Sequence, residues 1–231
     1  MQLHVSPKNR QLKSLENRIQ DVSFCAFDEL VQLLDVKDLT TGEHSSRLAT
    51  WANTICKLLG LSPDEARQVE IGAVLHDIGK IGIPDEILKK PARLTLEEQA
   101  VMREHPEYGW AVMKNMPGCE MASLLILHHH EMWNGEGYPA GLRGESIPLG
   151  ARVVAIIDAF DAMTTDRCYR PAISVEKALL TLEHFSGTQF DAKLVKMFAE
   201  YVRSEQFQCS EVPFMTRPTL SNTASAGSRK R

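Results

Sequence analysis

The spacing of apolar residues constrains the fold of this 231-residue chain more than any other feature. Most of the chain carries apolar residues three or four positions apart, and no segment shows a convincing run of strand-like alternation. Two capping boxes, Ser62-Pro63-Asp64-Glu65 and Thr95-Leu96-Glu97-Glu98, mark helix starts. The sequence therefore predicts an all-α fold, with about eight or nine helices in a single bundle-like domain.

The expected helices are separated by short connections and one longer loop. We expect helices over residues 24–36, 43–59, 62–76, 95–105, 119–130, 149–165, 175–185 and 192–202. Residues 135–148 hold four glycines and two prolines and are predicted to form a loop. Pro106 restarts or kinks the helix that reaches His105, and Asp191 is a candidate N-cap.

Composition excludes several classes of protein. The net charge of -4 gives no basic footprint for duplex nucleic acid or an anionic membrane. The five cysteines are scattered, without a Cys-x-x-Cys pair, which is typical of reduced thiols in a cytosolic protein. The sequence has neither a signal peptide nor a run of about 20 apolar residues. We therefore predict a cytoplasmic protein with no membrane segment.

Two adjacent pairs of polar residues, His76-Asp77 and His129-His130, indicate a metal site. Neighbours on a helix project roughly 100° apart, so both can bind only a metal that lies between their two directions. His44, His105 and Asp158 are single residues that complete the set. Imidazole and carboxylate without thiolate suit Fe(II), Mn(II) or Zn(II). The pattern predicts a metal-dependent hydrolase.

The two aspartates of this set have distinct roles in the prediction. Asp158 interrupts an otherwise apolar helix, where a carboxylate is costly unless it is paired or bound to a metal. Asp77 has two oxygens that can bridge two ions. Asp161, one turn after Asp158, can instead cap or support a neighbouring group. Lys80 can point into the same pocket as His76 and neutralise a phosphoryl oxygen, or it can be a surface lysine.

Each histidine taken alone has a structural explanation, as a satisfied core or surface side chain. Together they favour metal binding, because each would otherwise be a separate buried polar group. His4 and His184 match no pattern and are expected to be exposed, whereas His128 is expected to pack or to support a ligand. Two ions about 3.5–4 Å apart can share a bridging hydroxide, an arrangement most often used in phosphodiester hydrolysis.

Two segments resemble the signature motifs of HD-GYP domains, a branch of the HD superfamily of metal-dependent phosphohydrolases. They are HDIGK at residues 76–80 and HHEMWNGEGYP at residues 129–139. Further matches are at residues 41–47, 141–142, 147–148, 158, 161–163, 166–167 and 187–191. These matches run in order from about residue 28 to 200, and the ordered set is highly specific.

The resemblance implies an HD-type helical domain that hydrolyses the bacterial second messenger cyclic di-GMP to linear pGpG. It implies two divalent transition-metal ions, Fe or Mn, held by His44, His76, Asp77, His105, His129, His130 and Asp158. Asp77 and Lys80 are the implied catalytic residues. Substrate binding is assigned to Lys80, Gly137, Tyr138, Pro139, Arg167 and Arg170. The chemistry of these side chains agrees with the implied roles. The ring of Tyr138 offers a face on which guanine can stack, and an arginine can bind phosphate through two parallel N–H groups.

Three positions depart from the family pattern. Thr40 stands where some relatives carry a glutamate that helps to bind a third metal, so two ions are expected here. Cys168 stands where proline is common, and Pro171 where a basic residue is frequent. Neither of these two changes removes a ligand of a two-metal site.

The predicted phosphodiesterase domain spans residues 23–205, between a helical extension at 1–22 and a tail at 206–231 that is disordered from about 216. A heptad-like stripe from Leu12 to Ala26 fits either a homodimer contact or packing within the chain. A separate protein partner can supply regulation. The alternatives are hydrolysis of another cyclic dinucleotide such as cyclic GMP-AMP, a non-catalytic cyclic di-GMP receptor or interaction module, and a generic HD nucleotidase.

Overall fold

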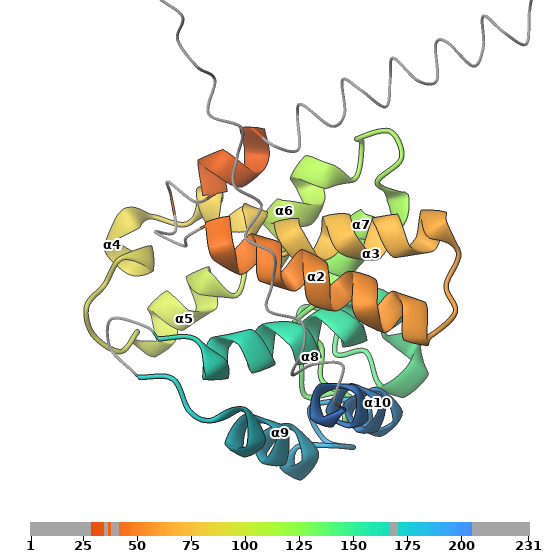
Figure 1. Ribbon diagram of the computed structural model, residues 1–231. Helices are drawn as coiled ribbons and strands as arrows, with labels where there is room; N and C mark the ends of the chain where they lie inside the picture. Colours follow the sequence, from red (N-terminus) through yellow and green to blue (C-terminus); the bar gives the residue numbers. More distant parts are fainter. Residues whose placement is uncertain (1–28, 35–36, 38–41, 167–170, 205–231) are drawn as a thin grey trace, which may run out of the picture.

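A computed structural model describes residues 29–34, 37, 42–166 and 171–204 of the chain. Within these ranges the secondary structure is helical and no β-strand is present, so the predicted all-α class is confirmed (Figure 1). Residues 29–34 are helical and precede the first labelled element. The α-helices are α2 (Gly42–Leu58), α3 (Pro63–Leu75), α4 (Asp85–Leu88), α5 (Leu96–Met102), α6 (His105–Met113), α7 (Glu120–His128), α8 (Leu149–Thr164), α9 (Val175–His184) and α10 (Ala192–Arg203). Two 3-10 helices, η1 (Ile78–Gly82) and η2 (Gly144–Ser146), lie in the connections.

The helix starts follow the capping signals of the sequence. Both capping boxes form, since Ser62 accepts from the backbone N–H of Glu65 and Thr95 accepts from that of Glu98. Asp191 caps α10 by accepting from the N–H of Lys193, as expected.

Two expected helix ends are wrong. The helix from Thr95 stops at Met102, and α6 begins afresh at His105 with Pro106 in its first turn. The helix expected over 119–130 ends at His128, because His129 is its C-cap. The four-residue helix α4 was not expected, since it is too short to show a periodic pattern.

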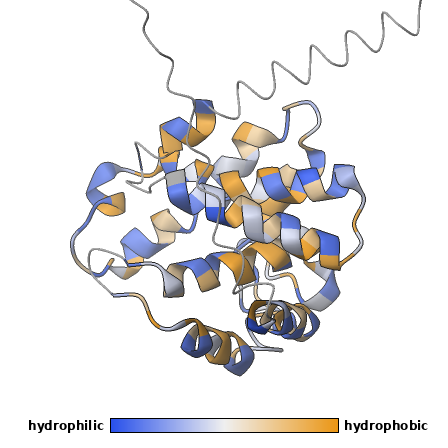
Figure 2. Cartoon of the chain, viewed as in Figure 1, coloured by the Kyte–Doolittle hydropathy of each residue, from blue (hydrophilic) through white to orange (hydrophobic). Residues whose placement is uncertain are grey.

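The larger hydrophobic core lies among α2, α3, α7, α8, α9 and α10. Its centre is an aromatic cluster in which the rings of Trp51, Phe160 and Phe198 meet edge to face at centroid distances of 5.0–5.6 Å. α9 and α10, beside α8 in Figure 1, mix hydrophobic and hydrophilic residues (Figure 2). Leu179 of α9 and Phe198 of α10 are buried in this core. The core therefore fixes α8, which carries Asp158, against α2, which carries His44.

A second, smaller core joins the helical residues 29–34 to α3, α6 and α7. Leu34, Leu75, Ile78, Met113 and Ile126 are its main buried side chains. It holds the end of α3 and the turn η1 against α6 and α7. The candidate ligands other than His44 and Asp158 lie where these elements meet.

Several predictions concern residues outside the described ranges. They are the extension at 1–22 with its dimer stripe, the tail at 206–231, Thr40, Arg167 and Arg170. Cys56 and Cys119 are buried free thiols, as expected. No helix in the described part of the chain is long and apolar enough to span a membrane.

Candidate metal centre

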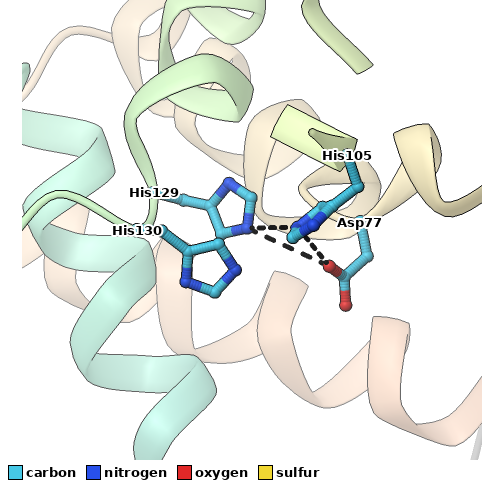
Figure 3. A group of neighbouring side chains, drawn as sticks. All are labelled: Asp77, His105, His129 and His130. Carbon is cyan, nitrogen blue, oxygen red and sulfur yellow. Dashed lines mark hydrogen bonds and ion pairs between the residues drawn. The ribbon is translucent and has the colours of Figure 1, made fainter. Parts of the chain in front are cut away.

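The seven predicted ligands come together in the fold, in two groups. His76 and His129 are the C-caps of α3 and α7, and His105 is the first residue of α6. The ligand atoms of the first group, and likewise those of the second, lie within 4.8 Å of one another. The first group is His44, His76 and Asp158, and the second is Asp77, His105, His129 and His130 (Figure 3).

Asp77 connects the two groups through its two oxygens. Its Oδ2 lies 3.2 Å from Nε2 of His76, in the first group, and its Oδ1 lies 3.2 Å from Nε2 of His105, in the second. His129 Nε2 is 3.9 Å from the same Oδ1 (Figure 3). A carboxylate in this orientation can place one oxygen on each of two ions.

Hydrogen bonds at Nδ1 fix the orientation of the imidazoles. His76, His105 and His129 each donate from Nδ1 to the carbonyl oxygen three residues earlier, at 2.7–2.8 Å. Because Nδ1 carries the proton, Nε2 is left to face the centre as a ligand atom. Three of the rings are therefore held with Nε2 toward the centre, the orientation that a metal requires.

His44 is oriented by a carboxylate instead of a carbonyl. Its Nδ1 donates to Oδ2 of the buried Asp161 at 2.7 Å, and Arg47 donates to both oxygens of the same carboxylate. These hydrogen bonds hold the pKa of Asp161 below its usual value, although burial opposes the shift. Asp161 thus supports a neighbouring group, which is one of the two roles expected for it.

The electrostatics favour neutral imidazoles at His129 and His130. Burial and the neighbouring histidines hold the pKa of His129 well below its usual range. Burial, followed by the charge of His105, lowers the pKa of His130 to about 3. His76 differs: burial opposes its charge, but Asp77 outweighs this and raises its pKa to about 9. Asp77 itself stays ionised, since His76 and Lys80 overcome its burial.

One close contact tests whether these residues fit a metal. Nε2 of His105 and Nε2 of His129 face each other at 3.3 Å, and both rings are buried. The neutral His129 has its proton on Nδ1, so its Nε2 directs a lone pair at the other nitrogen. Two inward-facing ring nitrogens beside a carboxylate oxygen are the donors that a divalent cation takes. The residues present therefore fit a metal ion.

Gly79 allows the turn that carries Asp77 to approach α6. A Cβ at this position would lie 1.8 Å from the carbonyl oxygen of His105 and 2.5 Å from the backbone nitrogen of Gly109. This contact places Lys80 beside the centre, with its Nζ 2.8 Å from Oδ2 of Asp77. Lys80 therefore lies beside the candidate centre with a half-buried side chain, where the sequence also allowed a surface lysine.

The loop after α7 folds back over the second group of ligands. The carboxylate of Glu131 is fully buried and accepts from the backbone N–H groups of Ala140 and Leu142, at 2.8 and 3.0 Å. A Cβ on Gly137 would lie 2.3 Å from the backbone nitrogen of Met132. The glycine, which the resemblance assigned to substrate binding, therefore permits a close approach of the loop to its own backbone.

Tyr138 stacks on a candidate ligand. Its ring lies 4.8 Å from that of His130, at an interplanar angle of 22°, and the next peptide bond, to Pro139, is cis. The guanidinium of Arg103 lies over the same ring, with Cζ 5.2 Å from the centroid. Burial raises the pKa of Tyr138 to about 12, so its hydroxyl stays protonated at neutral pH.

Other predicted positions are placed as follows. His184 is exposed, as expected. His128 lies beside the loop carboxylate, with its Nδ1 3.5 Å from Oε1 of Glu131, so it packs there. No role was expected for Glu131, Arg47 or Arg103. Glu131 and Arg47 lie inside matched motifs at residues 129–139 and 41–47, whereas Arg103 lies in none.

An all-helical domain that brings these histidines and aspartates together indicates an HD-type domain. Comparison with known families leads to the same class. The model of the HD domain family matches residues 29–194. The chain therefore belongs to the HD domain family, and its recognition as an HD-GYP domain is confirmed.

Two curated relatives with 34% and 37% sequence identity to this chain are named phosphodiesterases. The cyclic di-GMP phosphodiesterase response regulator RpfG of Xanthomonas campestris is 37% identical over 193 residues, covering 83% of this chain and 51% of its own. A cyclic di-GMP phosphodiesterase of Thermotoga maritima is 34% identical over 207 residues, covering 83% and 56%. The chain spans about half the length of these relatives.

Solved structures show the same fold. A cyclic GMP-AMP specific phosphodiesterase of V. cholerae superposes with a TM-score of 0.63 at 23% identity, covering 79% of this chain and 49% of the other. An HD-GYP-type protein from Bdellovibrio bacteriovorus gives a TM-score of 0.56 at 20% identity, covering 70% and 52%.

Proposed function

We propose that this chain is a two-metal phosphodiesterase that opens cyclic di-GMP to linear pGpG. The observation that carries the proposal is the position of Asp77, whose two oxygens face two separate groups of ligands. His44, His76 and Asp158 would hold one ion, and His105, His129 and His130 the other, with Asp77 shared. The donor set suits Fe or Mn.

Ions held by these residues would supply an activated water molecule and charge stabilisation for an in-line displacement at phosphorus. The protein residues supply the rest. Asp161 and the three carbonyl oxygens hold the imidazoles in one tautomer, so that the ligand atoms do not reorganise during turnover. Lys80 lies beside Asp77 and stabilises the negative charge that develops on the phosphoryl oxygens.

The loop after α7 binds the substrate beside the centre. Glu131 holds its backbone, and Tyr138 lies against His130, so the phosphate and a neighbouring base can be bound together. Arg167 and Arg170 are proposed to grip the second phosphate or a guanine.

A second candidate substrate is 3'3'-cGAMP. It is favoured by a relative of this chain, the 3'3'-cGAMP-specific phosphodiesterase 2 of Vibrio cholerae, which is 35% identical over 174 residues and of which the chain covers 33%. The two substrates share both phosphates and one guanosine. They therefore differ only in how the second base is recognised.

Competition between the two substrates tests the proposal. Metal-loaded protein is incubated with equal concentrations of cyclic di-GMP and 3'3'-cGAMP, and the products are separated by chromatography. We expect cyclic di-GMP to be consumed first, with pGpG as the main product. Asp77→Ala is the negative control, expected to lose metal and turnover and to keep its helical circular dichroism. Failure of the metal-loaded protein to cleave either substrate would contradict the proposal, and binding without turnover would favour the receptor alternative.

A further inference from the structure

Arg103 occupies a position that the proposed function does not yet use. It is the C-cap of α5, and its backbone N–H bonds to the carbonyls of Gln99 and Val101, which fixes the base of the side chain. The residue is exposed, yet its guanidinium lies over the ring of Tyr138. Tyr138 in turn stacks on the ring of His130. Three planar groups thus form a series that begins at a candidate metal ligand.

The hydrogen-bonding capacity of this guanidinium is not taken up by an acid. In the described part of the chain, the structure shows Arg103 on the tyrosine ring and in no ion pair with a carboxylate. By contrast, Arg47, Arg152 and Arg203 each bind an aspartate or a glutamate. Stacking on a ring fixes the plane of a guanidinium and leaves its N–H edge able to donate.

The position also separates this arginine from the reacting phosphate. Lys80 is the cation beside Asp77, at 2.8 Å, and it serves the phosphoryl group. Arg103 reaches the centre only through Tyr138 and His130. In a nucleotide bound at the centre, the group that extends away from the phosphate is the base. The Hoogsteen edge of guanine presents two acceptors, O6 and N7, which match the arginine fork, whereas adenine presents a donor in place of O6.

We propose that Arg103 is a specificity-determining residue that binds the Hoogsteen edge of a guanine of the substrate. The inference rests on the proposed cyclic dinucleotide activity and deepens it. The edge of the guanine then faces the N–H edge of the guanidinium. The contact with the Tyr138 ring keeps the guanidinium in position. The selectivity of the site for guanine over adenine then depends on one side chain.

Kinetics of position 103 variants test the proposal. Arg103→Ala should raise KM for cyclic di-GMP about 5- to 150-fold, the fold-change equivalent to one bidentate arginine–guanine pair. We expect kcat to change less than threefold, because the residue does not touch the reacting atoms. The ratio of kcat/KM for cyclic di-GMP to that for cyclic di-AMP should fall by a similar factor. Arg103→Gln should favour adenine, since an amide pairs with N6 and N7 of adenine.

Lys114→Ala is the matched control. It removes a cation that lies 4.1 Å from the Trp110 ring, at the opposite end of α6 from His105, and it should leave KM and selectivity unchanged. Equilibrium binding of cyclic di-GMP to metal-free protein gives a readout independent of turnover, and Arg103→Ala should weaken it. Unchanged binding and selectivity in well-folded Arg103→Ala and Arg103→Gln would overturn the inference. Wild-type protein that cleaves no cyclic dinucleotide would instead contradict the proposed function, and the binding measurement would still test Arg103.

Discussion

His44 donates a hydrogen bond from Nδ1 to Oδ2 of Asp161 at 2.7 Å, whereas His76, His105 and His129 donate to backbone carbonyls. A carboxylate makes the imidazole a stronger ligand than a carbonyl does, and the contact joins α2 to α8. The two halves of the centre are therefore supported differently. In the half that contains His44 and His76, one imidazole depends on a carboxylate and the other on a helix end, whereas His105 and His129 in the other half both depend on backbone carbonyls.

The first prediction concerns Asp161→Asn. We expect metal affinity at one of the two sites to fall about 10- to 100-fold, because the oriented carboxylate is lost. Isothermal titration calorimetry of the apo protein with metal measures the affinity of each site. We expect one weakened site and one unchanged site. Asp191→Asn is the control, since Asp191 is also buried and bound to an arginine, Arg152, at 2.7 Å. Equal loss of affinity in both variants would show that the effect is general destabilisation.

The second prediction concerns Glu131→Ala. Removal of this buried carboxylate leaves the part-buried N–H groups of Ala140 and Leu142 without their acceptor, at a cost below the roughly 1–3 kcal/mol of a fully buried group. The loop that carries Tyr138 should shift, and KM should rise while the metal content stays the same. Steady-state kinetics and metal analysis measure these effects. Glu131→Gln keeps one acceptor oxygen and should be intermediate; a wild-type KM in Glu131→Ala would contradict the assigned role.

The third prediction concerns Gly79→Ala. The added Cβ would overlap the backbone of His105 and Gly109, so the turn η1 must move away from α6. We expect a loss of stability of at least the roughly 1–3 kcal/mol typical of overpacking, together with loss of metal binding. Gly60→Ala is the comparison, because nothing lies within 4 Å of its added Cβ and only the positive φ of 68° is strained. It should cost roughly 1–2 kcal/mol and keep the metal. Metal retention in Gly79→Ala would refute the close-approach argument.

The fourth prediction concerns Lys80→Met. We expect kcat to fall roughly 10²- to 10³-fold, the usual effect of removing one group that stabilises charge in the transition state. Metal content should stay near the wild-type value, because the lysine is not a ligand. Lys90→Met is the control: it removes a half-buried lysine bound to Glu98 at 2.6 Å and should retain activity. A loss of metal in parallel with activity would show that Lys80 mainly holds Asp77.

Most of the helices and the grouping of the candidate ligands could be predicted from the sequence, because both leave local signals. Capping boxes placed Ser62 and Thr95, and adjacent pairs placed His76-Asp77 and His129-His130. Contacts between distant residues leave no such signal. His44 and Asp161 are 117 positions apart in the sequence. Arg103 and Tyr138, which are in contact, are separated in the sequence by α6 and α7. The position of the helix break near His105 was predicted wrongly, because a proline such as Pro106 can occupy the first turn of a new helix as well as a kink within one.

The central claim is that two ions, joined by Asp77, carry out the hydrolysis. Its most direct test is the hydrolysis of cyclic di-GMP by apo protein as a function of added Fe(II) or Mn(II), under anaerobic conditions. The account predicts that activity rises to a plateau at two equivalents of metal per chain, with two ions found by elemental analysis at the plateau. A plateau at one or three equivalents, or hydrolysis that does not depend on added metal, would contradict it.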